Sequence, residues 1–209
     1  VKKASPSKGI IANIFNPKLI AKNYQDGGAT CISVLTDEKY FLGSIDHLKE
    51  ISENSSIPII RKDFIISEYQ IFESKHIGAD CILLIHSILS KREILNFYKL
   101  ANELNLDVLI EVHNKEELLN IFDLDNVLIG INNRNLNTMK VDINNSIKLL
   151  DNLKTKPNLI CESGIKSIDD IKKLLKVDFK SFLIGEFLMK STNPKELLQN
   201  IFKLNRYIK

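Results

Sequence analysis

The chain has 209 residues, of which 44% are hydrophobic and 26% are charged, and its formal net charge is +3. These values are typical of a globular protein of one large or two small domains; they include no basic block of the kind that binds nucleic acid, and no apolar run approaches the roughly 20 residues of a membrane span. The three cysteines lie far apart in apolar runs, which predicts buried, reduced thiols in a cytoplasmic protein, and the four histidines lack the spacing of metal ligands.

Apolar strands alternate with amphipathic helices along the chain. The polar segment Lys2–Gly9 is predicted to be a loop that leaves a strand end, so we expect the first strand to be truncated at Val1. Residues 36–43, with Tyr40 and Phe41, are predicted to form another loop. Strands are predicted at 30–35, from 57 into 62, and at 81–85, 107–112, 127–131, 158–161 and 182–184. Helices are predicted at 16–25, 44–53, from 67 to the glycine at 78, at 90–103, 115–122, 144–153 and 167–175, and from 193 onward.

This alternation indicates a parallel sheet covered by helices. Seven full strands and the fragment at Val1 predict a (β/α)8 TIM barrel that lacks most of its first strand. An open doubly wound sheet is the alternative, but no Gly-x-Gly-x-x-Gly follows a strand. Because no linker or low-complexity segment is visible, residues 1–209 are predicted to form a single domain.

Polar residues stand where several predicted strands end, which is where barrels of this class place their sites. Side-chain alternation puts Lys62 on the same face as Ile60, and Glu111 on the same face as Leu109. If those faces point into the barrel, Lys62, Glu111 and Asn132 converge above its axis.

Each of these residues also has a structural explanation. Lys62 is also typical of a surface lysine where a strand meets water. Glu111 is also typical of a strand-end carboxylate that pairs with a loop lysine, and Asn132 is also typical of a residue that forms a turn. His113 is interpreted as a packed loop histidine.

Two strands are followed directly by glycine, at Gly164 and Gly185. Glycine lets backbone N–H groups approach an anion closely, and the loops after the seventh and eighth strands are the usual phosphate site of such barrels. A tight turn that requires a positive φ is the alternative.

The motifs around these strand ends closely resemble indole-3-glycerol phosphate synthase, the (β/α)8 enzyme of tryptophan biosynthesis. They occur in order, one in each unit, over nearly the whole chain. The matching stretches are Val1–Gly9, Ser33–Asp37 with Tyr40–Ser44, Arg61–Ile65, Gly78–Ile85, Leu109–His113, Ile129–Leu136, Glu162–Ile165 and Phe182–Met189. The resemblance implies conversion of 1-(2-carboxyphenylamino)-1-deoxyribulose 5-phosphate into indole-3-glycerol phosphate, CO2 and water, without a metal or organic cofactor.

The resemblance also implies the catalytic roles. Lys62 matches the general acid, and we expect burial near another cation to lower its pKa towards working pH. Lys2 matches the lysine that meets the substrate carboxylate and shares the acid role. Glu111 matches the general base, and Asn132 and Glu162 match residues that orient the reacting hydroxyls.

The remaining matches concern residues that bind the substrate, which is a small phosphorylated molecule. The phosphate end is expected at Ser7, Ser163, Gly164, Gly185 and Glu186, the last through its backbone N–H. The slot for the anthranilate ring is expected at Pro6, Phe41, Phe64 and Leu83, and Ser5 and Arg134 complete the expected substrate-binding residues.

The sequence departs from the family pattern at two places. Position 186 is Glu where many relatives have Ser, so its carboxylate must point away from a phosphate. The family also has a Glu immediately before the position of Val1, preceded by the first strand and N-terminal helices, so we expect residues 1–209 alone to fold poorly. Fusion to, or association with, another tryptophan-pathway enzyme is left open.

Two competing functions remain at this point. Phosphoribosylanthranilate isomerase, another phosphate-binding barrel, is expected to use a Cys and Asp pair at strand ends, whereas the cysteines here lie inside strands. An inactive phosphate-binding or scaffold protein is the alternative from a different class.

Overall fold

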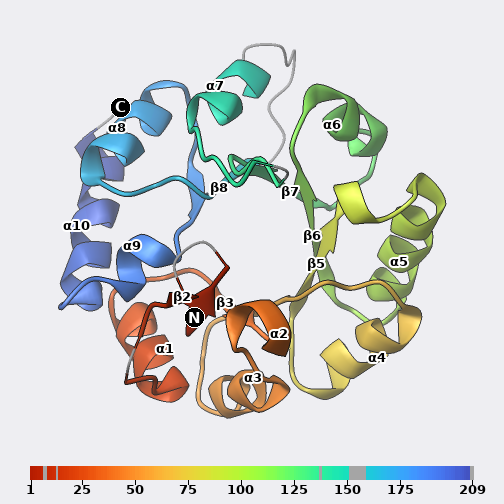
Figure 1. Ribbon diagram of the computed structural model, residues 1–209, viewed down its shortest axis with the longest axis horizontal. Coiled ribbons are helices and arrows are strands. Elements are labelled where there is room, and N and C mark those ends of the chain that lie inside the picture. The colour runs from red at the N-terminus through yellow and green to blue at the C-terminus, as the bar shows by residue number, and fades with distance from the viewer. Residues whose placement is uncertain (7–8, 13, 137, 151–158, 208–209) are drawn as a thin grey trace.

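The computed structural model of the protein describes residues 1–6, 9–12, 14–136, 138–150 and 159–207. Seven parallel strands pair in chain order and curl around a common axis, with the helices in a ring outside them (Figure 1). The strands are β3 (Ile32–Leu35), β4 (Ile59–Lys62), β5 (Cys81–Ile85), β6 (Asp107–Val112), β7 (Leu128–Asn132), β8 (Leu159–Glu162) and β9 (Ser181–Leu183). The predicted TIM barrel with a truncated first strand is therefore confirmed.

The outer ring consists of helices whose starts carry the expected capping residues. Asn16 Oδ1 accepts a hydrogen bond from Leu19 N, and Ser90 and Glu93 form a reciprocal capping box. The helices are α1 (Pro17–Asp26), α3 (Ile45–Ser52), α4 (Glu68–His76), α5 (Lys91–Glu103), α6 (Lys115–Ile121), α7 (Asn144–Leu150), α8 (Ile168–Lys176) and α10 (Pro194–Tyr207).

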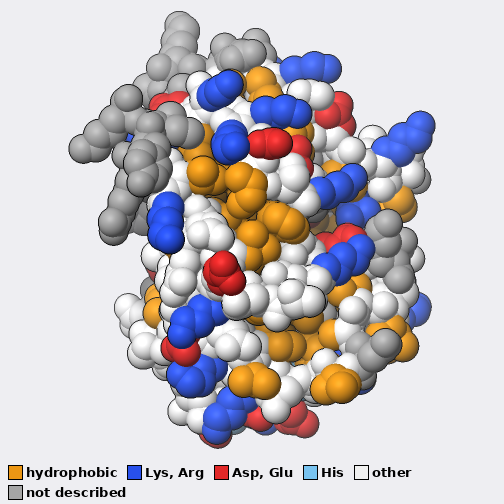
Figure 2. Space-filling view, turned by 90° about the vertical axis from the view of Figure 1, so that its left-hand side faces the viewer, with side chains coloured by type: hydrophobic (Ala, Val, Ile, Leu, Met, Phe, Trp, Pro, Cys, Tyr) orange, Lys and Arg blue, Asp and Glu red, His pale blue; other side chains and the backbone are white. Residues whose placement is uncertain are grey.

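On the side of the barrel that carries α8 and α10, charged side chains border hydrophobic ones at the surface (Figure 2). None of the helices in the described ranges is long and apolar enough to cross a membrane.

The N-terminal residues lie along one edge of the sheet. The Val1 ammonium donates to Ser33 O, and Leu35 N donates to Val1 O at 3.2 Å, so the Val1 main chain extends beside β3. The segment Lys2–Gly9 was predicted to be a loop. Part of it instead forms a short antiparallel pair, β1 (Ala4–Ser5) with β2 (Gly9–Ile10), next to the end of β3.

Three short helices occupy segments where no helix was predicted. α2 (Glu38–Phe41) forms within the expected loop 36–43 because Asp37 Oδ1 caps its first turn, accepting from Tyr40 N and Phe41 N. The other two are η1 (His86–Ile88) and α9 (Glu186–Met189). The predicted end of one helix at 153 and the predicted start of the strand at 158 lie outside the described residues.

The hydrophobic core has two parts, one between the strands and the helices and one inside the barrel. Ile60, Leu83 and Leu109 are buried in the inner part, so the predicted inward faces of β4 and β6 are confirmed. Lys62 and Glu111 follow at period two and project into the barrel above this apolar floor. The three cysteines are free thiols, Cys81 and Cys161 fully buried and Cys31 half-buried.

Candidate active site

A cavity of about 1380 Å³ occupies the barrel interior, from Thr30 and Cys31 before β3 to the C-terminal ends of the strands. Its volume exceeds the usual ~300–1,000 Å³ of small-molecule sites. All the predicted site residues line it except Ser7, which lies outside the described residues. They are Lys2, Ser5, Pro6, Phe41, Lys62, Phe64, Leu83, Glu111, Asn132, Arg134, Glu162, Ser163, Gly164, Gly185 and Glu186.

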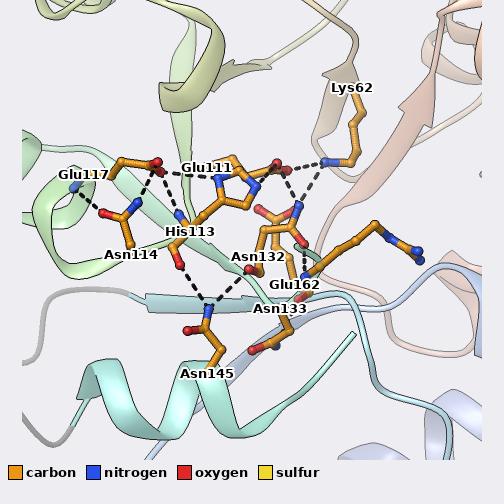
Figure 3. A network of polar contacts seen from close by, with 10 residues as sticks. Lys62, Glu111, His113, Asn114, Glu117, Asn132, Asn133, Asn145 and Glu162 are labelled. Atoms are coloured by element: carbon orange, nitrogen blue, oxygen red, sulfur yellow. Dashed lines mark hydrogen bonds and ion pairs between the residues drawn. The ribbon is translucent and has the colours of Figure 1, made fainter. Parts of the chain in front are cut away.

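Lys62 belongs to a polar network that joins strands from different parts of the barrel (Figure 3). Its Nζ donates to Glu111 Oε2 at 3.0 Å and to Glu162 Oε2 at 3.2 Å. Asn132 Nδ2 donates to Glu111 Oε1 at 2.8 Å. The predicted convergence of Lys62, Glu111 and Asn132 is therefore confirmed, and Glu162 joins them from β8.

The charges of this network influence one another strongly. Burial alone would raise the pKa of Glu111, but Lys62, His113 and Asn132 hold it well below its usual range. Burial raises the pKa of Glu162 to about 7, Lys62 opposes the rise, and the negative charge of Glu111 adds to it. Near neutral pH one carboxylate of the pair is thus ionised while the other binds a proton part of the time.

The expectation of a lowered pKa at Lys62 is wrong. Burial would lower the pKa of this lysine, but the carboxylates of Glu111 and Glu162 raise it above its ordinary value. The pKa of Lys2, in contrast, is lowered below its ordinary value. Burial is the main cause, the nearby cations Arg134 and Lys62 add to it, and the negative charge of Glu186 opposes it.

His113 holds Glu111 from the side opposite Lys62. Its Nε2 lies 3.4 Å from Glu111 Oε1, and its Nδ1 lies 3.3 Å from Glu117 Oε2 (Figure 3). Burial opposes protonation, yet the neighbouring carboxylates of Glu111 and Glu117 raise the pKa of His113 to about 9. The histidine is packed, as expected, but its contact with Glu111 was missed. Its position two residues after Glu111, just past the end of β6, was the available signal.

Asn133 joins three segments behind the site and was not singled out in the sequence. Its Nδ2 donates to Glu162 O at 3.0 Å and to Ser163 O at 3.1 Å. Its Oδ1 accepts from the backbone N and the hydroxyl of Ser146 in α7. The end of β7, the loop after β8 and α7 are therefore tied to one side-chain amide.

The two strand-end glycines differ in backbone conformation and in packing. Gly164 has φ +91°, and a Cβ there would lie 2.8 Å from Val141 Cγ1, so a tight, closely packed turn accounts for it. A Cβ on Gly185 would meet only Lys2, with Nζ at 3.6 Å. The backbone at Gly185 thus lies next to the Lys2 cation, at a distance that a Cβ would fill with ordinary contacts. Glu186 Oε1 is held by Lys190 Nζ at 2.6 Å.

The loops after β3 and β4 form an aromatic side of the cavity. The rings of Phe41 and Phe64 have centroids 6.4 Å apart, and Tyr40 packs edge-on against Phe64 at 5.9 Å. Leu83 is buried in the barrel floor, and Pro6 is exposed at the mouth.

The two other predicted substrate-binding residues line the cavity near its polar groups. Ser5 Oγ is buried and has no hydrogen-bond partner in the described part of the chain. Arg134 N donates to Asn132 Oδ1 at 2.9 Å, and its guanidinium donates to Met139 O at 3.3 Å.

Comparison with known structures relates the barrel to enzymes of low sequence similarity. Thiamine phosphate pyrophosphorylase from Pyrococcus furiosus superposes with a TM-score of 0.70 at 14% identity, covering 91% of this chain and 89% of that one. KGPDC from Streptococcus mutans superposes with a TM-score of 0.70 at 13% identity, covering 92% and 93%. At such identities the likeness supports the fold alone.

Comparison at the sequence level is specific. The chain is 46% identical to indole-3-glycerol phosphate synthase of Lachnoclostridium phytofermentans, over 98% of this chain and 75% of that protein. It is 44% identical to the enzyme of the same name from Petrotoga mobilis, over 99% of this chain and 83% of that protein. The family model described as indole-3-glycerol phosphate synthase matches residues 1–201. The chain therefore belongs to the indole-3-glycerol phosphate synthase family.

Proposed function

We propose that this protein is a carboxy-lyase of tryptophan biosynthesis in the cytoplasm. It closes the ring of 1-(2-carboxyphenylamino)-1-deoxyribulose 5-phosphate and releases indole-3-glycerol phosphate, CO2 and water. The observation that carries the proposal is the position of Lys62 Nζ between Glu111 and Glu162, inside a cavity that has an aromatic side and a glycine-lined side.

The substrate has an aromatic end and a phosphate end, which match those two sides. Phe41 and Phe64 offer ring faces for the anthranilate group. On the β8 and β9 side, the phosphate binds at Ser163 and at the backbone of Gly185, beside the Lys2 cation. Lys2 then lies between the phosphate and the substrate carboxylate and draws both anions inward.

Ring closure needs a proton donor at the carbonyl oxygen. The ring carbon bearing the carboxylate forms a bond to the carbonyl carbon, and the carbonyl electron pair moves onto the oxygen, which takes a proton from the Lys62 ammonium. A raised pKa keeps Lys62 protonated before the reaction. The alkoxide that forms is a stronger base than an amine, so the transfer remains favourable. The carbon–carbon bond to the carboxylate then breaks, CO2 leaves, and the ring regains its electrons.

Dehydration needs a base and an acid together. Glu111 is ionised in the resting site, and loss of the Lys62 proton during ring closure removes a charge that lowers the pKa of Glu111. Glu111 then becomes basic enough to take the proton from the substrate. Glu111 passes this proton to the Lys62 amine, which lost its own proton in ring closure and lies 3.0 Å from Glu111 Oε2. The restored Lys62 ammonium protonates the leaving hydroxyl, water departs, and a proton from solvent recharges Lys62 for the next cycle. Asn132 fixes the Glu111 carboxylate by its hydrogen bond, and Glu162 orients the reacting hydroxyl from β8.

The proposal is tested by adding the carboxyphenylamino substrate to purified protein and following indole fluorescence together with CO2 release. Both signals are expected to rise in equal amounts and without an added metal or cofactor. The dephosphorylated substrate serves as the control for recognition of the phosphate. An absence of both signals in protein shown to be folded would contradict the proposal, as would fluorescence that does not depend on the phosphate.

A further inference from the structure

Gly130 lies in the middle of β7 and faces the barrel interior, between Leu128 and Asn132 at period two. Its φ is not among the positive values of the chain, so the backbone itself does not require glycine. Glycine inside a strand weakens the strand and frequently marks a place where another group approaches closely. The neighbouring strand supplies that group.

Glu162 on β8 occupies the space that a side chain at position 130 would fill. A Cβ on Gly130 would lie 1.9 Å from Glu162 Oε1 and 2.9 Å from its Cδ. Both distances are below any real contact, so the carboxylate lies across the bare Cα of Gly130. A side chain at 130 and the present position of Glu162 exclude each other.

The same carboxylate contacts Lys62 on the far side of the barrel. Its Oε2 accepts from Lys62 Nζ at 3.2 Å, while its buried Oε1 has no hydrogen-bond partner among the described residues. The oxygen nearest Gly130 therefore lies where it does because Gly130 has no side chain, and no described donor binds it. Any group added at 130 would push this oxygen away, and the other oxygen would leave Lys62 with it.

We infer that Gly130 is a positioning residue of the active site, whose missing side chain seats the Glu162 carboxylate against Lys62. The inference rests on the proposed function for its effect on turnover. The effect of Gly130 on the position of the Glu162 carboxylate is independent of that function.

The test is Gly130→Ala, with Ile129→Val as the matched control. Ile129 is buried on the outer face of the same strand, so its truncation leaves a small void without touching the cavity. Gly130→Ala is expected to lower kcat by about 10²-fold, the effect of misplacing a group by about 1 Å, and to leave the unfolding temperature near that of the parent protein. Ile129→Val is expected to lower the unfolding temperature and to keep kcat.

A double-mutant cycle separates a displaced carboxylate from a damaged strand. In a Glu162→Ala background the alanine at 130 no longer meets the carboxylate, and its one remaining close contact is Leu109 Cδ1 at 3.2 Å. Adding Gly130→Ala is therefore expected to change kcat and stability much less than it does in the parent protein. If Gly130→Ala alone folds poorly, recovery of folding when Glu162→Ala is added supports the inference that Gly130 positions the Glu162 carboxylate. The same penalty in both backgrounds overturns it.

A readout that does not use turnover is the titration of Lys62, followed by NMR of its side chain. Displacing Glu162 removes one of two carboxylates, so Gly130→Ala is expected to lower the pKa of Lys62, and Ile129→Val is expected not to. A lowered pKa in a protein without synthase activity would support the inference about Gly130 while the proposed function fails. An unchanged pKa, with Glu162 still on Lys62 in a crystal structure of Gly130→Ala, would overturn the inference alone.

Discussion

Arg61 and Lys62 are consecutive cations on one strand, and they point to opposite faces of the barrel wall. All five N–H donors of Arg61 are used: Nε by Thr36, Nη1 by Gln70 O and Ser74, and Nη2 by Asp63 and Glu73. Its side chain is 3% exposed. Such a network leaves nothing for a ligand.

Lys62 has a different set of neighbours. Its side chain is 20% exposed towards the cavity, and the described residues provide acceptors for two of its three ammonium hydrogens. One of its acceptors, Glu162, retains an oxygen without a partner. A buried charge whose donors are all used serves only the structure around it, whereas an incompletely saturated one beside a cavity is available for chemistry.

The largest expected effect separates the two cations by activity. Lys62→Met removes the proposed acid and should lower kcat by on the order of 10²–10⁴. Stability should change much less, because Glu162 can take up a proton and Glu111 keeps His113 as a neighbouring cation. Steady-state kinetics together with urea unfolding measures both quantities. An unaltered kcat would exclude Lys62 as the acid.

The matched substitution on the outer face should give the reverse result. Arg61→Met leaves Asp63 and Glu73 without their buried cation and should cost about 3–5 kcal/mol of the free energy of unfolding. Turnover per folded molecule should be retained, because Arg61 points away from the cavity. Unfolding curves in urea measure the loss. If Arg61→Met lowers kcat as much as Lys62→Met does, the distinction between the faces fails.

A smaller effect is expected at the proposed phosphate end. Gly185→Val fills the space beside Lys2 and should raise KM about tenfold, equivalent to about 1.4 kcal/mol of binding, while kcat is retained. Gly185→Ala is the graded control, since its methyl group would make an ordinary contact with Lys2 Nζ. Equal KM values for the three proteins would argue against phosphate binding here.

The smallest effect concerns His113. Its folded-state pKa, about 9, lies above its ordinary value of 6.5, so its protonation contributes stability that is fully present below about pH 6.5. That contribution is lost as the pH rises through about 9. Glu117→Gln removes one carboxylate from the imidazole and should lower the pKa of His113 and flatten the fall in stability between these pH values.

NMR titration of the imidazole and urea unfolding at several pH values measure both effects. Glu116→Gln serves as the control, because Glu116 lies in the same first turn of α6. A pKa of His113 that is the same in Glu117→Gln as in the parent protein would contradict the assignment.

The sequence was sufficient wherever strand periodicity governed the structure. The alternation of Ile60 with Lys62, and of Leu109 with Glu111, determined which side chains enter the barrel, and both predictions are confirmed. α2 was missed because a single capping aspartate, Asp37, outweighed the weak helical signal of four residues.

The alternation of side chains along a strand does not predict which residues meet across the barrel. Glu162 and Lys62 are 100 residues apart and meet only when the sheet closes. The pKa of Lys62 depends on that meeting, which is why the expected direction was wrong. The role of Gly130 depends on it as well, because an ordinary strand glycine becomes informative only beside a carboxylate from β8.

The amide of Asn133 has a consequence for attempts to exchange parts between barrels. Because it bonds to the backbone after β8 and to Ser146 of α7, the last strands and their loops are not interchangeable modules. A graft whose new loop after β8 moves the carbonyls of residues 162 and 163 would break bonds made from β7. A successful transplant has to carry residues from β7 to the turn at Ser163 as one cassette.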